Sequence, residues 1–374
     1  MYKSIDRSRR TIDFLNPDIR WSDIFRAVKS IRSGWLVPGS QASFFEDRFA
    51  GYLGAEKSYL TSSATASVEI ALLLAGVGPG DEVICASITW VSPATSILWL
   101  GAKPIFCDVN RDTYLIDADS IRKLVTPKTK AIIVTHLYGQ MADMNSITQI
   151  AAERNIKVIE DAAHAIESSR DGIKPGQESF AACFSFHAAK NITSGQGGAL
   201  IIEAPQELVK LARRCGVSNN EHDERIMSTF GGKFDLTDFQ AALLLGQLER
   251  IEKNRRKRET IFEHYEEMCR KLNLKFPHRR RQDVHAYHQF TLEVEPIQRR
   301  PIRKFLRDRG ISTSIHFRPV HKEPFFSTKG AMTHLPNAEI IGERTLSLPT
   351  HTKLTLRDLR YIEKNLSEGL LERH

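Results

Sequence analysis

The sequence has no apolar run long enough to cross a membrane. Its longest apolar runs, such as residues 70–75, are far shorter than the roughly 20 apolar residues that a membrane-spanning helix needs. Residues 1–13 are rich in charge and contain no apolar core, so we expect no signal peptide. These absences indicate no membrane partner and lead us to expect a cytoplasmic protein.

Cysteine is also scarce, and its spacing follows no motif. The five cysteines form no Cys-x-x-Cys pair, and three of them lie inside apolar runs. Disulfide frameworks and zinc sites both need cysteines at defined spacings. We therefore expect reduced, buried thiols, and we predict no metal site.

Neither the apolar nor the charged fraction departs from that of ordinary soluble proteins. The chain has 374 residues, of which 41% are hydrophobic and 26% charged, and a chain of this length is expected to form two domains.

The formal net charge of +8 includes basic clusters at residues 255–258 and 279–281. Nucleic-acid binding is one interpretation, but the first cluster lies in a predicted long helix and no nucleic-acid module is recognisable. A solvated basic face, or attraction of an anionic small substrate, explains the charge better.

Short β-rich runs alternate with helical patterns along the first half of the chain. Two amphipathic helices come first, over residues 21–33 and 44–52. The predicted strands are residues 58–61, 82–86, 104–108, 130–136, 157–160, 182–186 and 199–203. Helical patterns at 66–75, 93–100, 120–125 and 146–155 lie between several of them. This repetition predicts an α/β fold with a mostly parallel sheet that helices cover on both faces.

The second half of the chain has a different pattern. A short helix is predicted over residues 207–215, a polar and mobile loop over 218–233, and a long helix over 238–272. The predicted elements beyond it are strands over 284–295 and 311–317 and helices over 301–309 and 356–366. We therefore predict a large domain over residues 1–255 and a smaller α+β domain over residues 256–374.

The stretch Phe-Ser-Phe-His-Ala-Ala-Lys-Asn, residues 184–191, places a lysine directly after a predicted buried strand. A Gly-rich turn and a second apolar strand follow it. Lysine is costly to bury, and a desolvated lysine has a lowered pKa that suits Schiff-base chemistry. Lys190 is therefore the candidate nucleophile; the alternative is an ordinary surface lysine in a turn.

Other predicted strand ends carry matching chemistry, at the edge where open parallel sheets bind ligands. Residues 62–67 open a helix whose free N–H groups suit a phosphate, although Ser and Thr are also ordinary helix caps. Trp90 either stacks on a flat ring or belongs to the core. Asp161 could pair with the protonated nitrogen of a heterocycle, as pyridoxal phosphate enzymes require, or cap a helix. Ser185 could donate to a phosphate or satisfy a neighbouring backbone group.

Together these motifs resemble the DegT/DnrJ/EryC1/StrS sugar aminotransferases. The resemblance rests on Ser63-Ala64-Thr65-Ala66, on Glu160-Asp161-Ala162-Ala163-His164 and on residues 184–191, and it covers nearly the whole chain. It implies a fold type I enzyme that depends on pyridoxal 5′-phosphate (PLP), acts on nucleotide-linked keto sugars and forms a homodimer with shared active sites. Within the family, Phe-His-x-x-Lys-Asn-Ile-Thr and Ile315-His316-Phe317-Arg318 look closest to enzymes that aminate C4 of a UDP-pentose or UDP-hexose.

The resemblance also implies roles for individual residues. It makes Lys190 the lysine that holds the cofactor and Asp161 the partner of the pyridine nitrogen. The other expected cofactor contacts are Trp90 over the ring, His164 near the ring hydroxyl, and Ala64, Thr65, Ser185 and Asp235 at the phosphate. For the substrate, His316 and Arg318 are candidates, because Arg can grip phosphate oxygens with two hydrogen bonds. The alternative is that Arg318 only pairs with a nearby carboxylate.

Three of these positions depart from the family pattern. Ala64 stands where Gly is commoner, and His164 replaces a commoner Gln. Asp235 stands where the family often has an Asn that reaches the partner subunit's phosphate, which would repel a carboxylate. For the dimer, the long helix offers an apolar stripe of Leu244, Leu248 and Ile251.

The sequence therefore predicts amino transfer, with glutamate as the donor and Lys190 moving the proton. A keto-sugar dehydratase on the same scaffold is a second hypothesis, but that branch of the family has histidine in place of the lysine. A non-catalytic regulator or nucleic-acid-binding protein is a third, suggested by the charge alone.

Overall fold

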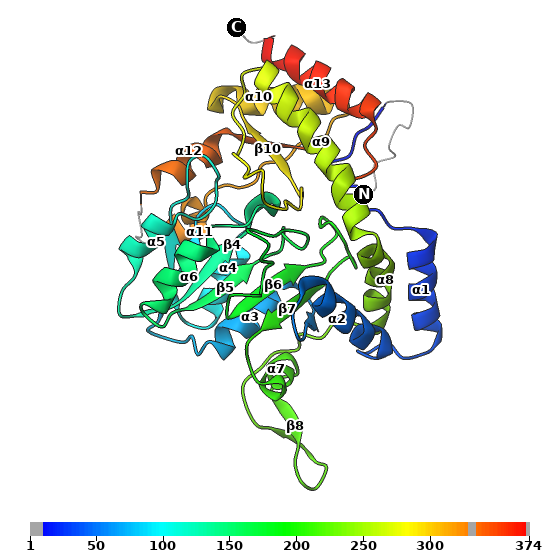
Figure 1. The fold of residues 1–374 in the computed structure, drawn as a ribbon, viewed down its shortest axis with the longest axis vertical. Coiled ribbons are helices and arrows are strands. Elements are labelled where there is room, and N and C mark those ends of the chain that lie inside the picture. The colour runs from blue at the N-terminus through cyan, green and yellow to red at the C-terminus, as the bar shows by residue number, and fades with distance from the viewer. Residues whose placement is uncertain (1–9, 328–333, 372–374) are drawn as a thin grey trace.

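A seven-stranded sheet lies at the centre of the computed structural model, which describes residues 10–327 and 334–371 (Figure 1). The strand order is β1-β7-β6-β5-β4-β2-β3. The bounds are β1 (Tyr59–Thr61), β2 (Glu82–Ala86), β3 (Lys103–Cys107), β4 (Thr129–Thr135), β5 (Lys157–Asp161), β6 (Ala181–Ser185) and β7 (Gly198–Ile202). All pairs are parallel except those of β7, which runs antiparallel to β6 and to β1. The predicted α/β fold is confirmed, and each of these strands begins and ends within one residue of its predicted bounds.

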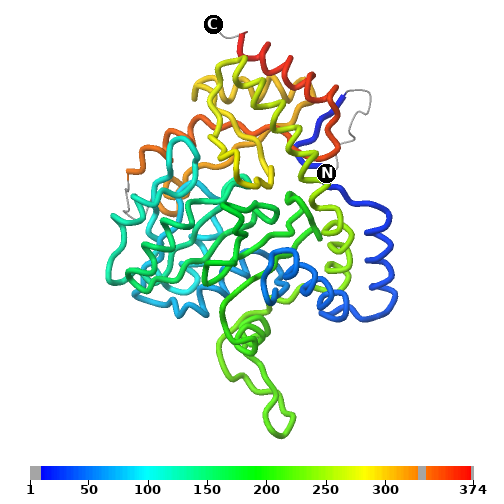
Figure 2. The backbone as a smooth tube through the Cα atoms, viewed as in Figure 1, coloured from blue at the N-terminus to red at the C-terminus, as the bar shows by residue number. Residues whose placement is uncertain are grey.

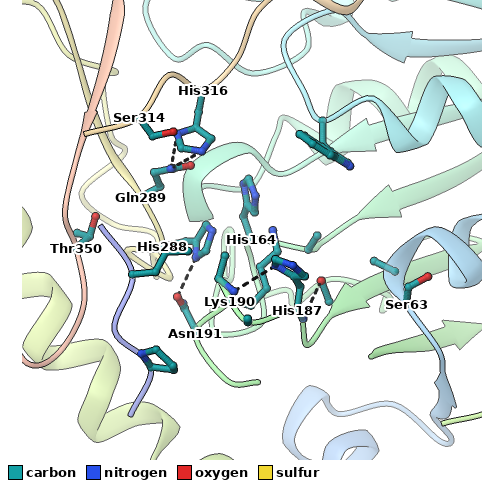
Figure 3. Close-up of a pocket in the computed structure, with 18 of the residues that line it drawn as sticks. Ser63, His164, His187, Lys190, Asn191, His288, Gln289, Ser314, His316 and Thr350 are labelled. Carbon is teal, nitrogen blue, oxygen red and sulfur yellow. Dashed lines mark hydrogen bonds between the residues drawn. The ribbon is translucent and has the colours of Figure 1, made fainter. Parts of the chain in front are cut away.

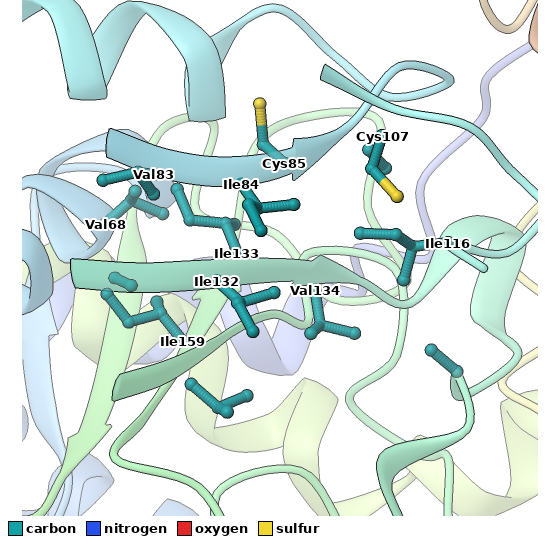
Figure 4. Close-up of a cluster of buried hydrophobic side chains, with 14 of the residues drawn as sticks. Val68, Val83, Ile84, Cys85, Cys107, Ile116, Ile132, Ile133, Val134 and Ile159 are labelled. Carbon is teal, nitrogen blue, oxygen red and sulfur yellow. The ribbon is translucent and has the colours of Figure 1, made fainter. Parts of the chain in front are cut away.

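Helices cover the sheet on both faces. In the first half of the chain they are α1 (Trp21–Arg32), α2 (Ser40–Leu53), α3 (Ala64–Leu74), α4 (Ser92–Trp99), α5 (Ala118–Leu124), the 3₁₀ turn η1 (Leu137–Gly139), α6 (Met144–Ala152) and α7 (Gln206–Arg213). Successive strand residues point to opposite faces, and Ile132, Ile133 and Val134 of β4 are all fully buried (Figure 4). No helix in the described ranges is long and apolar enough to span a bilayer.

The long helix predicted over 238–272 is two helices, α8 (Asp238–Glu249) and α9 (Ile251–Lys271). The helical path breaks at Arg250, whose guanidinium donates to Asp18 at 3.0 Å and to the fully buried Asp23 of α1 at 2.9 Å. These ion pairs hold α1 alongside α8. The division between domains at residue 255 stays a prediction, and it falls within α9.

The apolar stripe of Leu244, Leu248 and Ile251 is buried within its own chain. These side chains share a hydrophobic cluster with Phe45 and Phe49 of α2. The expectation that they face a second subunit is therefore wrong, because α2 already covers them.

The C-terminal part combines a small antiparallel sheet with helices. Its elements are β10 (Phe290–Glu293), α10 (Pro296–Asp308), the 3₁₀ turn η2 (Val320–Lys322), α11 (Pro324–Ser327), α12 (Pro336–Arg344), β11 (Thr345–Leu348) and α13 (Leu356–Leu371). The predicted α+β character is present, but two strand predictions are wrong in extent. The strand predicted over 284–295 is only β10, and residues 311–317 form only isolated bridges, from Ile311 to Ile12 and from Ser314 to Ser347. Because these partners come from two different segments, no continuous ladder forms there.

The polar stretch at 218–233, predicted as a loop, contains a short hairpin. β8 (Val217–Asn219) pairs with β9 (Arg225–Met227), and the hairpin extends away from the body of the protein (Figures 1 and 2). Its residues are largely exposed, so no apolar pattern marks it in the sequence.

Gly198 at the start of β7 allows this strand to pass against the beginning of α3. A Cβ atom at this position would lie 2.4 Å from the carbonyl carbon of Ser63 and 2.6 Å from the nitrogen of Ala64. We predict that Gly198→Ala lowers the free energy of unfolding by about 1–3 kcal/mol, because the backbone must shift to admit the methyl group. Thermal denaturation measures the effect. The control is Gly78→Ala, whose Cβ would meet nothing within 4 Å; equal stability of the two variants would contradict the prediction.

Candidate active site

A cavity of about 560 Å³ opens at the edge of the sheet where β1, β2, β5 and β6 end (Figure 3). Because β7 is antiparallel to both neighbours, β1 runs in the same direction as β6 and also ends at this edge. Of the ten residues that the sequence selected, eight line the cavity: Ala64, Thr65, Trp90, Asp161, His164, Ser185, Lys190 and His316. The cavity therefore gathers segments that lie far apart in the sequence.

Lys190 and Asp161 both line the cavity, and their charges interact. Burial lowers the pKa of the Lys190 amine to about 8, and the Asp161 carboxylate opposes this shift only in part. Burial raises the pKa of Asp161, while a hydrogen bond from the Ala163 N–H at 3.2 Å and the charge of Lys190 oppose the rise. Lys190 is therefore not an ordinary surface lysine, and a larger fraction of its amine is unprotonated at neutral pH than in an exposed lysine.

The N-terminus of α3 forms one wall of the cavity. The Ser63 hydroxyl caps the helix by accepting the N–H of Ala66 at 3.1 Å. The N–H groups of Ala64 and Thr65 precede the first intrahelical hydrogen bond, and such groups bind anions. The helix cap and the anion site are thus compatible, since they use different groups of the same turn.

Trp90 and His164 present rings to the cavity. The Trp90 side chain is exposed rather than part of the core, at 60%. His164 accepts the N–H of Tyr138 at its Nδ1 atom, at 3.2 Å, and burial holds its pKa well below the usual range. The neutral ring therefore carries its proton on Nε2 and can donate there.

Asp235 and Arg318 lie outside the residues that line this cavity. Asp235 forms ion pairs with three cations, Arg213 at 3.1 Å, Arg214 at 3.4 Å and Lys233 at 3.6 Å. Arg318 is 59% exposed, donates to the Lys322 carbonyl at 2.6 Å and lies 3.8 Å from Glu323. The roles inferred for both residues stay predictions.

Several cavity residues were not found from the sequence. Residues 14–18, which precede α1, line the cavity, and Phe14 stacks on His316 with ring centroids 5.6 Å apart. His288 also lines the cavity, and its ring centroid lies 4.4 Å from that of His164. Neither residues 14–18 nor His288 follows a strand of the central sheet, so a search of the residues after predicted strands does not identify them. Of the two explanations for the basic clusters, a solvated face is wrong for Arg258, which is 3% exposed, pairs with Glu167 and lines the cavity.

The profile of the DegT/DnrJ/EryC1/StrS aminotransferase family matches residues 17–367. The chain belongs to this family. Its members are PLP-dependent sugar aminotransferases, so the chain is a PLP-dependent aminotransferase, as the sequence predicted.

Solved structures of similar proteins agree with this assignment. TlmJ, an aminotransferase from Streptoalloteichus hindustanus, has a TM-score of 0.91 and 30% identity, with 98% of this chain and 100% of that chain covered. Spr1654 from Streptococcus pneumoniae has a TM-score of 0.91 and 28% identity in its PLP form, covering 96% of this chain and 98% of that one, and it was also solved in a PMP form. A DegT DnrJ EryC1 StrS aminotransferase from Brucella abortus has a TM-score of 0.84 and 28% identity, covering 93% and 95% of the two chains.

The residues of the cavity fit PLP. The lack of a side chain on Gly198 leaves the start of α3 undisturbed, so its N–H groups can hold a phosphate beside Ser185. Lys190 supplies an amine for a Schiff base, and Asp161 supplies a carboxylate for the pyridine nitrogen. Trp90 offers an exposed indole for the ring face.

The lowered pKa of Lys190 can be measured on the cofactor-free protein. We predict that acetylation of Lys190 by acetic anhydride rises with pH about a midpoint near 8, compared with roughly 10.4 for an ordinary lysine. In Asp161→Asn the midpoint should fall, because the removed carboxylate favours the charged amine. Peptide mass spectrometry across a pH series gives the midpoints. Asp47→Asn, at an exposed position on α2, is the control; an Asp161→Asn midpoint at or above the wild-type value would contradict the prediction.

Proposed function

We propose that this aminotransferase moves an amino group from glutamate onto C4 of a nucleotide-linked keto sugar. The observation that carries the proposal is the partly desolvated Lys190 beside Asp161 in a cavity that also fits the cofactor. Membership of a sugar aminotransferase family supports a sugar as the acceptor. The motifs around Lys190 and His316 support C4 as the position, because they resemble those of C4 aminotransferases.

The protein's own groups then have distinct tasks. When bound, PLP supplies an electron-accepting ring that stabilises negative charge next to the transferred nitrogen. Asp161 keeps the pyridine nitrogen protonated, and the Lys190 amine, once displaced by the amino donor, is free to take up and return the substrate proton. His164 carries its proton on Nε2 and would donate it to the ring hydroxyl, near which the family resemblance places this residue.

Two other functions are less well supported. A keto-sugar dehydratase on this scaffold would lack the lysine that this chain retains. A nucleic-acid-binding protein was suggested by the basic clusters, but Arg258 of the first cluster is buried in an ion pair. Arg279 of the second cluster is likewise paired with Glu266, at 2.9 Å. The positive charge is thus partly internal, which weakens this alternative.

The first test identifies the lysine that holds the cofactor and asks whether glutamate donates the amino group. We expect borohydride to fix pyridoxal phosphate on Lys190, and glutamate to bleach the cofactor absorbance of the untreated enzyme. Asp161→Asn should retain the cofactor but slow the glutamate half-reaction on the order of 10²-fold, because an amide cannot hold the pyridinium charge. Peptide mapping and stopped-flow absorbance are the measurements. A reduced adduct on another lysine, or a wild-type rate in Asp161→Asn, would refute the assignment.

The second test concerns the diphosphate of the sugar substrate. Arg318 is exposed next to the His316-Phe317 segment of the cavity, so a diphosphate that extends beyond the cavity would compete with the Lys322 carbonyl and Glu323 for its guanidinium. We expect Arg318→Ala to raise KM for the nucleotide sugar and to leave the glutamate half-reaction nearly unchanged, because only ground-state binding of one substrate is lost. Arg122→Ala, in an exposed ion pair with Glu153, is the control. If both half-reactions suffered equally, or neither did, Arg318 would not be the diphosphate residue.

We also propose that the enzyme is a homodimer. With the stripe of Leu244, Leu248 and Ile251 excluded, the support comes from α1, whose Trp21 and Phe25 side chains are 84% and 70% exposed. An apolar helix face of this kind favours a protein partner. Sedimentation should give twice the chain mass for the wild type, and a smaller mass for Trp21→Glu combined with Phe25→Glu. Ile297→Glu, at an isolated exposed position on α10, should remain dimeric. A fully active wild-type monomer would exclude the shared site.

A further inference from the structure

A buried ion pair, Arg258 with Glu167, has no role in the amino transfer described above. Arg258 of α9 donates to Glu167, which follows β5, and both side chains are almost completely buried. Arg258 also donates to the Ala286 carbonyl through Nε, at 3.2 Å. A buried carboxylate must have its lone pairs satisfied, and Glu167 takes its remaining hydrogen bonds from Asn191.

These contacts leave the Asn191 amide one possible orientation. Its Nδ2 group lies 3.1 and 3.0 Å from the two Glu167 oxygens and 3.1 Å from the Ala286 carbonyl oxygen. All three are acceptors in this arrangement, so the amide nitrogen must face them. The Asn191 Oδ1 atom is therefore the one that faces His288, at 3.0 Å from its Nδ1 atom (Figure 3).

The orientation of Asn191 in turn determines which nitrogen of His288 carries the proton. An amide oxygen can only accept, so Nδ1 of His288 must be the donor. Burial, together with the charges of Lys190 and Arg258 and the neighbouring His316 and His285, holds the pKa of His288 well below its usual range. The ring is therefore neutral, and Nε2 keeps a free lone pair.

His164 has the opposite arrangement. Its Nδ1 accepts the Tyr138 N–H, so its proton is on Nε2. The two rings lie 4.4 Å apart and both line the cavity around Lys190. Of the two neighbouring rings, one therefore has a donor at Nε2 and the other has an acceptor at Nε2.

We propose that Asn191, oriented by Glu167 and Arg258, is a positioning residue that fixes the Nδ1–H tautomer of His288. His288 Nε2 then accepts a hydrogen bond from a hydroxyl or ammonium group of the sugar substrate. The inference rests on the proposed function for the identity of that substrate. The tautomer itself depends only on the contacts within the chain.

The tautomer can be read directly from the holoenzyme labelled with ¹⁵N-histidine. Two-bond ¹⁵N–¹H correlation spectra distinguish Nδ1–H from Nε2–H, and His288→Gln identifies the signals of His288. We expect Nδ1–H in the wild type and a shift toward Nε2–H in Asn191→Ala, because the acceptor at Nδ1 is lost. Asn145→Ala is the control; Asn145 is exposed, and its side chain forms no hydrogen bond with the described residues. A wild-type His288 protonated on Nε2, or an unchanged tautomer in Asn191→Ala, would overturn the proposal.

The kinetic measurement separates positioning from a purely structural role. His288→Gln should slow the sugar half-reaction on the order of 10²-fold, and Asn191→Ala should slow the same half-reaction by a smaller factor. A residue that only holds the loop would lower the melting temperature without moving the tautomer. If Asn191→Ala does not fold, the wild-type spectrum still decides the tautomer. If no amino transfer to a sugar occurs at all, the proposed function fails while the tautomer result stands.

Discussion

The ion pair between Glu167 and Arg258 joins the parts of the chain that form the active site. Glu167 follows a strand of the central sheet and accepts a hydrogen bond from Asn191 in the loop of Lys190. Arg258 belongs to the helix that leads to the C-terminal part, and it donates to Glu167 and to the Ala286 carbonyl in the segment before β10. Removing one partner of a buried pair typically costs about 3–5 kcal/mol, because the other charge is left uncompensated. The position of the reactive lysine loop is therefore tied to the relative position of these two elements.

The electrostatic character of the site follows from the burial of its titratable side chains. Desolvation lowers the pKa of Lys190 and of the histidines 164, 288 and 316, and it raises that of Asp161. All of these groups are thereby shifted toward their neutral forms. An added anionic cofactor with a protonated ring nitrogen would counteract the shift at Asp161 in particular, because it brings a positive charge to a buried carboxylate.

The sequence was sufficient for the central sheet because its strands are short apolar runs, and helical patterns separate most of them. It was also sufficient for the residues at the ends of those strands, since open parallel sheets present their ligands there. The sequence did not predict the features that depend on tertiary contacts alone. Nothing in the basic run around Arg258 distinguishes one buried arginine from its solvated neighbours, and an isolated His288 before a strand has no local signal. The break at Arg250 depends on Asp18 and Asp23, more than 200 residues earlier, so helical periodicity continues through it.

Two segments that lie far apart in the sequence, residues 14–18 and 350–352, both line the cavity. The segments are also linked directly, by the ion pair of Arg10 with Asp358 at 2.6 Å and by the contact of His351 with the Asp13 carbonyl at 3.1 Å. During synthesis on the ribosome the central sheet can form early, because all of its strands lie before residue 203. The cavity, in contrast, cannot close until the last segment has emerged. The cavity residues that fit the cofactor all precede residue 203, so a nascent chain interrupted before residue 350 would carry the reactive lysine and the cofactor groups without the last wall of the cavity.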